Sequence, residues 1–355
     1  MMKRTVIGLI AVFFAFGTFA ILTRTVDSQM AAKPTATPTP TPIPEEDQIV
    51  RVDTELVNVD VRVIDRFSRP INGLQQSEFK VFEDGVQQKI DFFSRSEVPT
   101  NYTLVIDNSG SLRSQIEQVI EASKILVKAN RPADETSVIR FISSEKIEIL
   151  QDFTSNQTDL IDALEGQYIE GGSTAIIDAV YLAAEKVTSY EKSERSVDRK
   201  RRALVLVSDG EDVTSFYTQQ QLFERLKETE VQIYVVGFIK DLSTERGFIT
   251  KSKQSKAKSF LEKLASETGG RAYFPNTTGE LNGIAQEIAA ELRMQYSIGY
   301  IPTNDRKDGT FRNIKVTVSD GPNGQKRIPV TRAGRIAEKE GEPSTVQKAT
   351  AKPNN

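Results

Sequence analysis

The middle of the chain alternates short apolar runs with amphipathic helical segments, and this alternation constrains the fold more than any other feature. We expect strands at 103–107, 137–142, 146–150, 203–208, 232–238 and 271–274. We expect helices at 112–129, 158–164, 175–190, 219–229, 256–268 and 280–292. The runs 104–106 and 203–207 are apolar without interruption, which is typical of parallel strands covered on both faces. The pattern predicts a doubly wound, mainly parallel α/β sheet.

β-Rich sequence lies on both sides of this middle part. Residues 49–65 alternate polar with apolar side chains, and two further runs, 79–82 and 88–93, flank a Glu-Asp-Gly turn and predict a hairpin. Three later strands are expected, at 295–300, 311–318 and 326–331. Because neither flank has enough strands to bury a core by itself, we expect the two flanks to pair into one small β-sandwich in which the α/β sheet is inserted.

The N-terminus predicts export. After Lys3 and Arg4, residues 5–23 carry no charge and are rich in Phe, Ile, Val and Leu. A helix of that length spans about 28 Å, close to the thickness of a hydrocarbon core. Its basic start favours a cytoplasmic N-terminus, so we expect an inner-membrane anchor with the bulk of the chain facing the periplasm or the extracellular space. The alternative is a cleaved signal peptide and a secreted protein.

These patterns together predict the domain boundaries. We expect a membrane anchor or signal peptide at 1–26, a Pro/Thr-rich linker at 27–48, the first part of the sandwich at 49–98, the α/β domain at 99–293, the second part of the sandwich at 294–336 and a disordered tail at 337–355. The linker alternates proline with threonine, a composition that holds an extended spacer without internal hydrogen bonds.

Composition excludes several classes of chemistry. The chain has no histidine and no cysteine, so Ser-His-Asp and Cys-His catalysis, thiolate zinc sites and disulfides are all excluded. Only oxygen ligands remain for a metal, which favours Mg²⁺, with Mn²⁺ or Ca²⁺ as alternatives. A net charge of −3 and the lack of a basic cluster interleaved with aromatic residues argue against nucleic-acid binding.

Five short oxygen-bearing side chains stand where an apolar run or a glycine turn gives way to a helix: Asp107, Ser109, Ser111, Thr174 and Asp209. Ligands of doubly wound sheets bind beyond the carboxyl ends of the strands, so we expect these residues to converge on one divalent cation. We assign the two serines as direct ligands, the threonine as direct or water-mediated, and the two aspartates as acting largely through waters or the hydroxyls. One coordination position would remain for a partner's Asp or Glu.

Simpler interpretations compete with this site. The first aspartate and serine are good helix N-cap residues, and Asp209-Gly210 can be a plain turn. Glu211 and Asp212 can extend an acidic rim or bind a second ion, and the simpler interpretation is that they are solvated turn residues or helix N-terminal charges. Asp178, one turn into its helix, is expected to hydrogen-bond a loop, and the alternative is that it reaches the shell of the metal.

The three segments resemble the motifs of von Willebrand factor A domains. Residues 107–111 (DNSGS) match the D-x-S-x-S pattern of that family, 171–178 (GGSTAIID) its glycine-threonine loop, and 208–212 (SDGED) its final aspartate loop. The flanking sequence is similar to a bacterial "VWFA-related" group. The resemblance implies that the five residues form a metal-ion-dependent adhesion site.

We therefore expect a binding module rather than an enzyme, one that recognises a protein with an exposed Asp or Glu. Two alternatives stay open: a scaffold whose metal site is purely structural, and a metal-dependent hydrolase. The hydrolase interpretation lacks a second acidic cluster and a nucleophile with an evident base.

Overall fold

The computed structural model describes residues 56–95, 98–193, 200–240, 242 and 252–339. Every described residue belongs to one compact unit of the chain. The predicted anchor or signal peptide at 1–26 and the predicted linker at 27–48 therefore lie outside the described residues. Within the described part of the chain, no helix combines the length and apolar content needed to cross a membrane.

Six strands form the central sheet, in the order β10-β9-β8-β5-β6-β7. They are β5 (Thr100–Asp107), β6 (Glu135–Ser143), β7 (Lys146–Thr154), β8 (Arg201–Ser208), β9 (Val231–Gly237) and β10 (Ala272–Tyr273). Neighbouring strands run parallel, except that β6 and β7 form an antiparallel pair at one edge. All residues of β5 are buried, as expected of a strand covered on both faces.

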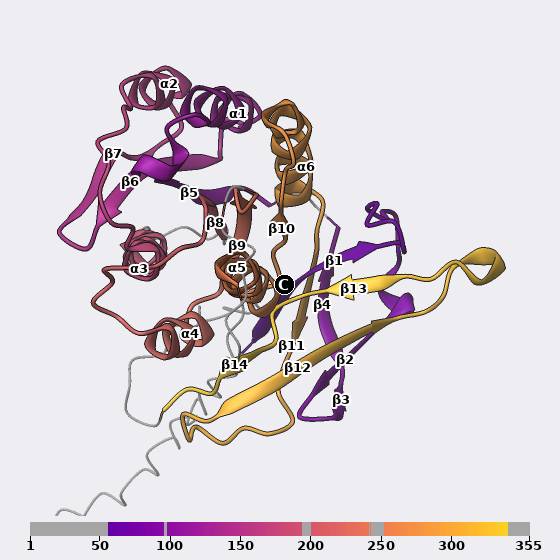
Figure 1. Ribbon diagram of the computed structural model, residues 1–355. Coiled ribbons are helices and arrows are strands. Elements are labelled where there is room, and N and C mark those ends of the chain that lie inside the picture. Colours follow the sequence, from indigo (N-terminus) through magenta and orange to yellow (C-terminus); the bar gives the residue numbers. More distant parts are fainter. Residues whose placement is uncertain (1–55, 96–97, 194–199, 241, 243–251, 340–355) are drawn as a thin grey trace, which may run out of the picture. The chain divides into compact units, whose positions relative to one another are not determined.

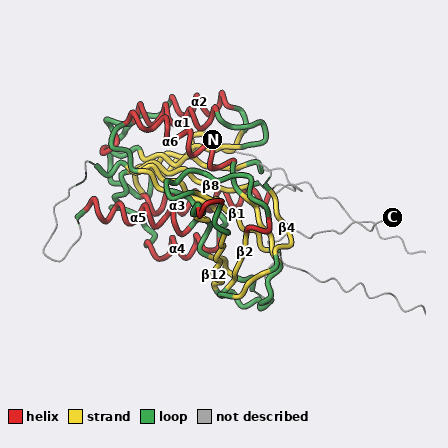
Figure 2. Tube along the Cα trace, turned by 90° about the vertical axis from the view of Figure 1, so that its right-hand side faces the viewer, coloured by secondary structure: helices red, strands yellow, loops and turns green. Residues whose placement is uncertain are grey.

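Helices cover both faces of this sheet (Figure 2). One layer contains α1 (Ile116–Lys128), α2 (Gln157–Glu165) and α6 (Leu281–Arg293), and the other contains α3 (Ile176–Ser193), α4 (Gln219–Glu228) and α5 (Lys253–Glu267). Side chains of β5 alternate between the layers, because Leu104 and Ile106 pack with the first and Val105 with the second. The structure confirms the predicted doubly wound, mainly parallel α/β sheet.

The remaining strands form two four-stranded sheets, in the orders β13-β1-β11-β4 and β14-β12-β2-β3 (Figure 1). They are β1 (Val57–Ile64), β2 (Phe79–Glu83), β3 (Val86–Gln88), β4 (Ile90–Ser94), β11 (Tyr296–Tyr300), β12 (Phe311–Val318), β13 (Ile328–Val330) and β14 (Gly334–Ile336). Their apolar side chains form a core separate from those of the α/β sheet. In the sequence, the α/β sheet is inserted between β4 and β11. These two strands pair antiparallel, so the chain leaves the sandwich and returns to it on neighbouring strands. This arrangement confirms the predicted insertion in a β-sandwich.

Three details of the sandwich differ from the expectation. The predicted strand 88–93 divides at Lys89, because β3 pairs with β2 whereas β4 pairs with β11 of the other sheet. Periodicity does not predict β14, which is too short to show a pattern. Residues 337–339 of the predicted tail continue the ordered chain, since Ala337 is buried and its N–H donates to the Thr310 carbonyl at 2.9 Å. Residues 340–355 lie outside the described residues.

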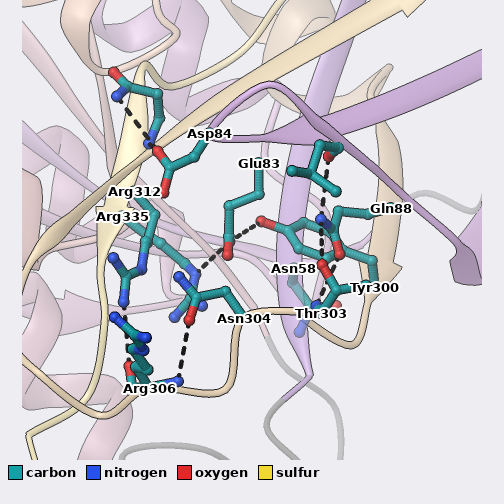
Figure 3. Close-up of polar contacts among 12 residues, drawn as sticks. Asn58, Glu83, Asp84, Gln88, Tyr300, Thr303, Asn304, Arg306, Arg312 and Arg335 are labelled. Atoms are coloured by element: carbon teal, nitrogen blue, oxygen red, sulfur yellow. Dashed lines mark hydrogen bonds and ion pairs between the residues drawn. The ribbon is translucent and has the colours of Figure 1, made fainter.

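A buried polar cluster joins the two sheets of the sandwich (Figure 3). Glu83, at the end of β2, accepts hydrogen bonds from the Tyr300 hydroxyl of β11 at 2.6 Å and from Arg335 Nε of β14 at 2.9 Å. All three side chains are buried. A carboxylate withdrawn from water is tolerated only where charged or hydrogen-bonding partners replace the solvent. The contact from Tyr300 therefore fixes one sheet against the other.

We predict that Tyr300→Phe lowers the free energy of unfolding by about 1–3 kcal/mol, because it removes a hydrogen-bond donor from a buried carboxylate. The measurement is a denaturant titration of the wild type and the variant. Tyr168→Phe is the matched control, because Tyr168 is 56% exposed and its hydroxyl donates only to Glu170, at 3.3 Å on the protein surface, so its removal is expected to cost little. Equal unfolding midpoints for wild type and Tyr300→Phe would contradict the proposed role of this contact.

Candidate metal-binding site

The five predicted residues lie on three loops at the carboxyl edge of the central sheet. Asp107 is the last residue of β5, and Ser109 and Ser111 follow in the turn that leads to α1. Asp209 directly follows β8, and Thr174 lies in the loop that precedes α3. Strands β5 and β8 are parallel neighbours, with Ile106 opposite Val207, so their carboxyl ends meet at the same edge. The structure thus brings the loops together as the sequence predicts.

Ser208 links the first loop to the third. One oxygen of Asp107 accepts from the backbone N–H of Ser109 at 2.9 Å, and the other accepts from the Ser208 hydroxyl at 2.7 Å. The same Ser208 oxygen accepts from the backbone N–H of Gly210 at 3.1 Å. Ser208 is fully buried and positions Asp107 across the strand pair. Sequence reasoning assigns it no role, although its place at the strand end beside Asp209 is a usable signal.

The two serine hydroxyls face one another. Ser109 Oγ and Ser111 Oγ lie 2.8 Å apart, and Ser109 is buried whereas Ser111 is exposed. At this separation, one cation on the solvent side of the turn could contact both oxygens. The turn after β5 therefore places the two hydroxyl oxygens side by side.

The threonine loop packs against both of the others. Gly171 and Gly172 have φ values of +83° and +131°, which only glycine adopts readily, and a Cβ on Gly172 would come within 2.6 Å of Ile142 Cγ2. A Cβ on Gly110 would lie 3.8 Å from the Cα of Gly171, so the serine loop and the glycine turn are in contact. The Thr174 carbonyl accepts from the backbone N–H of Val213 at 2.8 Å, which ties the threonine loop to the aspartate loop.

The two aspartates form a buried pair without a cationic partner. Asp107 is fully buried and Asp209 is 3% exposed. Burial raises the pKa of the Asp107 carboxyl from 3.8 to about 6, and the negative charge of Asp209 acts in the same direction. Neither carboxylate forms an ion pair with a described residue. The ammonium group of the nearby Lys253 pairs instead with Glu211, at 2.9 Å. A bound cation would offset this accumulation of negative charge.

The donor set fits a hard divalent cation. Every candidate donor is an oxygen, and the threonine that contributes a hydroxyl, Thr174, is a buried residue. Among the described residues no group of three or more His, Cys, Asp or Glu side chains is placed to hold a metal. The site is therefore rich in hydroxyl groups and holds only two carboxylates. This composition suits Mg²⁺, which keeps part of its water shell and needs few protein ligands.

The other acidic candidates hold loops. Asp178 accepts from the backbone N–H groups of Phe216 at 2.8 Å and Tyr217 at 2.9 Å, which agrees with the expectation that it hydrogen-bonds a loop. Asp212 accepts from the N–H of Ile177 in the first turn of α3 at 3.2 Å, as a helix N-terminal charge does. These contacts anchor the loop that follows Asp209 to the start of α3.

Comparison with known proteins identifies the family of the α/β part of the chain. A family model of the von Willebrand factor type A domain matches residues 101–287. Inter-alpha-trypsin inhibitor heavy chain H4 from Homo sapiens is 24% identical over 240 residues, an alignment that covers 62% of this chain and 23% of that protein. The matched part of the chain therefore corresponds to about a quarter of the length of this curated relative.

Two solved structures are similar at low identity. A von Willebrand factor type A protein from Catenulispora acidiphila has 10% identity and a TM-score of 0.45, with 82% of this chain and 76% of that chain covered. An aerotolerance-related membrane protein from Bacteroides fragilis has 19% identity and a TM-score of 0.40, with 54% and 98% covered. The family match spans more than half of the chain, including the α/β sheet and all three loops. The chain belongs to the von Willebrand factor type A domain family.

Proposed function

We propose that this protein is an exported protein-binding module whose recognition site is a divalent cation held by Asp107, Ser109, Ser111, Thr174 and Asp209. The observation that carries the proposal is the meeting of two uncompensated buried carboxylates with serine and threonine hydroxyls at one sheet edge. Domains of this family serve as metal-dependent adhesion and protein-interaction modules, which supports the same function.

Each residue has a distinct part in this proposal. Ser109 and Ser111 present two neighbouring hydroxyl oxygens, and Thr174 adds a third from the opposite loop. Asp107 and Asp209 supply negative charge from behind the hydroxyls, and Ser208 holds Asp107 in place. When bound, Mg²⁺, or alternatively Mn²⁺ or Ca²⁺, would supply an open coordination position for a partner's Asp or Glu side chain.

Binding rather than catalysis is the proposed role. The chain has no histidine or cysteine to serve as base or nucleophile. The described residues hold no further acidic cluster that would complete a two-metal site. The uncharged segment 5–23 supports export and a membrane anchor at the N-terminus.

We predict that Asp107→Asn is more stable than the wild type in metal-free buffer at pH 7. The rise in the pKa of Asp107 from 3.8 to about 6 corresponds to a cost of about 3 kcal/mol for ionising this group in the folded protein. Since the folded-state pKa is raised, the cost is absent below pH 4, develops between about pH 4 and 6, and is complete above pH 6. Unfolding measured by denaturant across this pH range should show an advantage of about 1–3 kcal/mol for the variant at pH 7 that shrinks towards pH 4.

Saturating Mg²⁺ should reverse this order, because it stabilises the wild type and leaves Asp107→Asn unchanged. Asp162→Asn is the control, because Asp162 is an exposed carboxylate in α2. The prediction fails if Asp107→Asn is less stable than the wild type without metal, or if Mg²⁺ stabilises both equally.

A partner captured by the full chain should require both the cation and the site. We predict that chelator, Asp107→Asn and Thr174→Ala each weaken binding to the purified partner by about 10- to 100-fold or more. Ser114→Ala, which changes an exposed serine just beyond Ser111, should bind like the wild type. Calorimetry with the purified partner is the measurement, and binding that survives both chelator and Asp107→Asn would point to a scaffold whose metal site is structural.

A further inference from the structure

Exposed apolar side chains gather on the loops that surround the candidate site. Phe216 is 82% exposed, the highest value for a large apolar side chain among the described residues, and Val213 is 67% exposed. Both belong to the loop that follows Asp209, and the backbone N–H of Val213 bonds directly to the Thr174 carbonyl. Before Thr174 in the chain, Tyr168 is 56% exposed, and its carbonyl accepts from the side chain of Asn108, next to Asp107, at 2.8 Å. Exposed apolar groups are ordinary when scattered, but a group at a recognition site indicates a contact surface.

The loop between β8 and α4, which carries Val213 and Phe216, is anchored to the start of α3 by hydrogen bonds, and α3 and α4 lie side by side (Figure 1). The buried carboxylate of Asp178 accepts from the backbone N–H groups of Phe216 and Tyr217. The ring of Tyr217 stacks on that of Tyr181, with centroids 4.0 Å apart. Because the loop backbone is fixed before any partner arrives, little conformational entropy is lost when Phe216 is covered. Such pre-organisation is typical of a binding surface.

A positive charge stands on the serine side of the site. Arg113 follows Ser111 by two residues and is exposed. Its Nη2 lies 4.0 Å from the position of a Cβ built on Gly171, so the guanidinium lies over the glycine turn that leads to Thr174. Arg113 forms no ion pair with any residue that the structure describes. Its charge complements an acidic partner and would also attract a second acidic group close to the first.

We infer that the partner presents an acidic side chain with a large apolar side chain close to it in sequence. Val213 and Phe216 form the surface that covers the apolar side chain, and Arg113 attracts the acidic segment. This inference rests on the proposed function, because it names the chemistry of the partner that the same site would take. It assigns specificity to three residues that are not candidate metal ligands.

The test is a selection of random linear peptides displayed on phage against the full chain in Mg²⁺ buffer, with release by chelator. We expect the released peptides to combine an Asp or Glu with a nearby aromatic or large aliphatic residue. The strongest peptide is then titrated against variants. The double variant Val213→Ser/Phe216→Ser should weaken binding by about 10- to 100-fold, as loss of buried anchor side chains does. Arg113→Gln should weaken it by about 2- to 5-fold and reduce its dependence on salt.

Phe67→Ser is the matched control, because Phe67 is also an exposed phenylalanine, at 70%, but lies in the sandwich after β1. Thermal melts of all variants verify that they fold. Chelator-released peptides without an apolar preference, or equal affinity for the wild type and the double variant, overturn the inference and leave the proposed function standing. Peptides that stay bound in chelator, or a selection that yields no cation-dependent peptide, contradict the proposed function and the inference with it.

Discussion

Parallel pairing of β5 with β8 is the constraint on which the rest of the site depends. The pairing places Asp107 and Asp209 at one edge of the sheet, where burial and the nearby charge of Asp209 raise the pKa of Asp107. Ser208 secures Asp107 from the neighbouring strand, and the glycine turn at 171–172 brings Thr174 close without a steric clash. The α/β core thus holds an electrostatically unfavourable pair of groups in place, an arrangement typical of sites that bind a cation.

The sandwich contacts the opposite end of the same strands. Arg201, the first residue of β8, pairs with Asp60 of β1 at 3.4 Å and donates to the carbonyl of Gln295 at 3.2 Å. Arg62 of β1 forms a buried ion pair with Glu291 of α6. Because β8 places roughly 25 Å between its ends, the contacts with the sandwich and the candidate site lie at opposite edges of the sheet. This separation leaves the loops with Arg113, Val213 and Phe216 accessible to a partner.

Sequence patterns predict the α/β sheet well, because its strands are long, apolar and regularly alternated with amphipathic helices. They predict the sandwich less well, since the change of sheets at Lys89 and the short strand β14 depend on pairing between distant segments. In the site, the spacing of Asp107, Ser109 and Ser111 indicates one turn, and the position of Asp209 after a second apolar run predicts the same edge, where the register of β5 with β8 places it. The role of Ser208 and the exposure of Phe216 depend on tertiary contacts, which periodicity does not report.

The most direct test of cation binding at this edge of the sheet is anomalous scattering from crystals of the protein grown with Mn²⁺. The proposed site predicts a single strong peak among the oxygens of Ser109, Ser111 and Thr174, at about 2.1–2.2 Å from its direct ligands, with Asp107 and Asp209 within reach directly or through one water. No peak at this position in fully Mn²⁺-saturated crystals, or a peak bound only elsewhere, would contradict it.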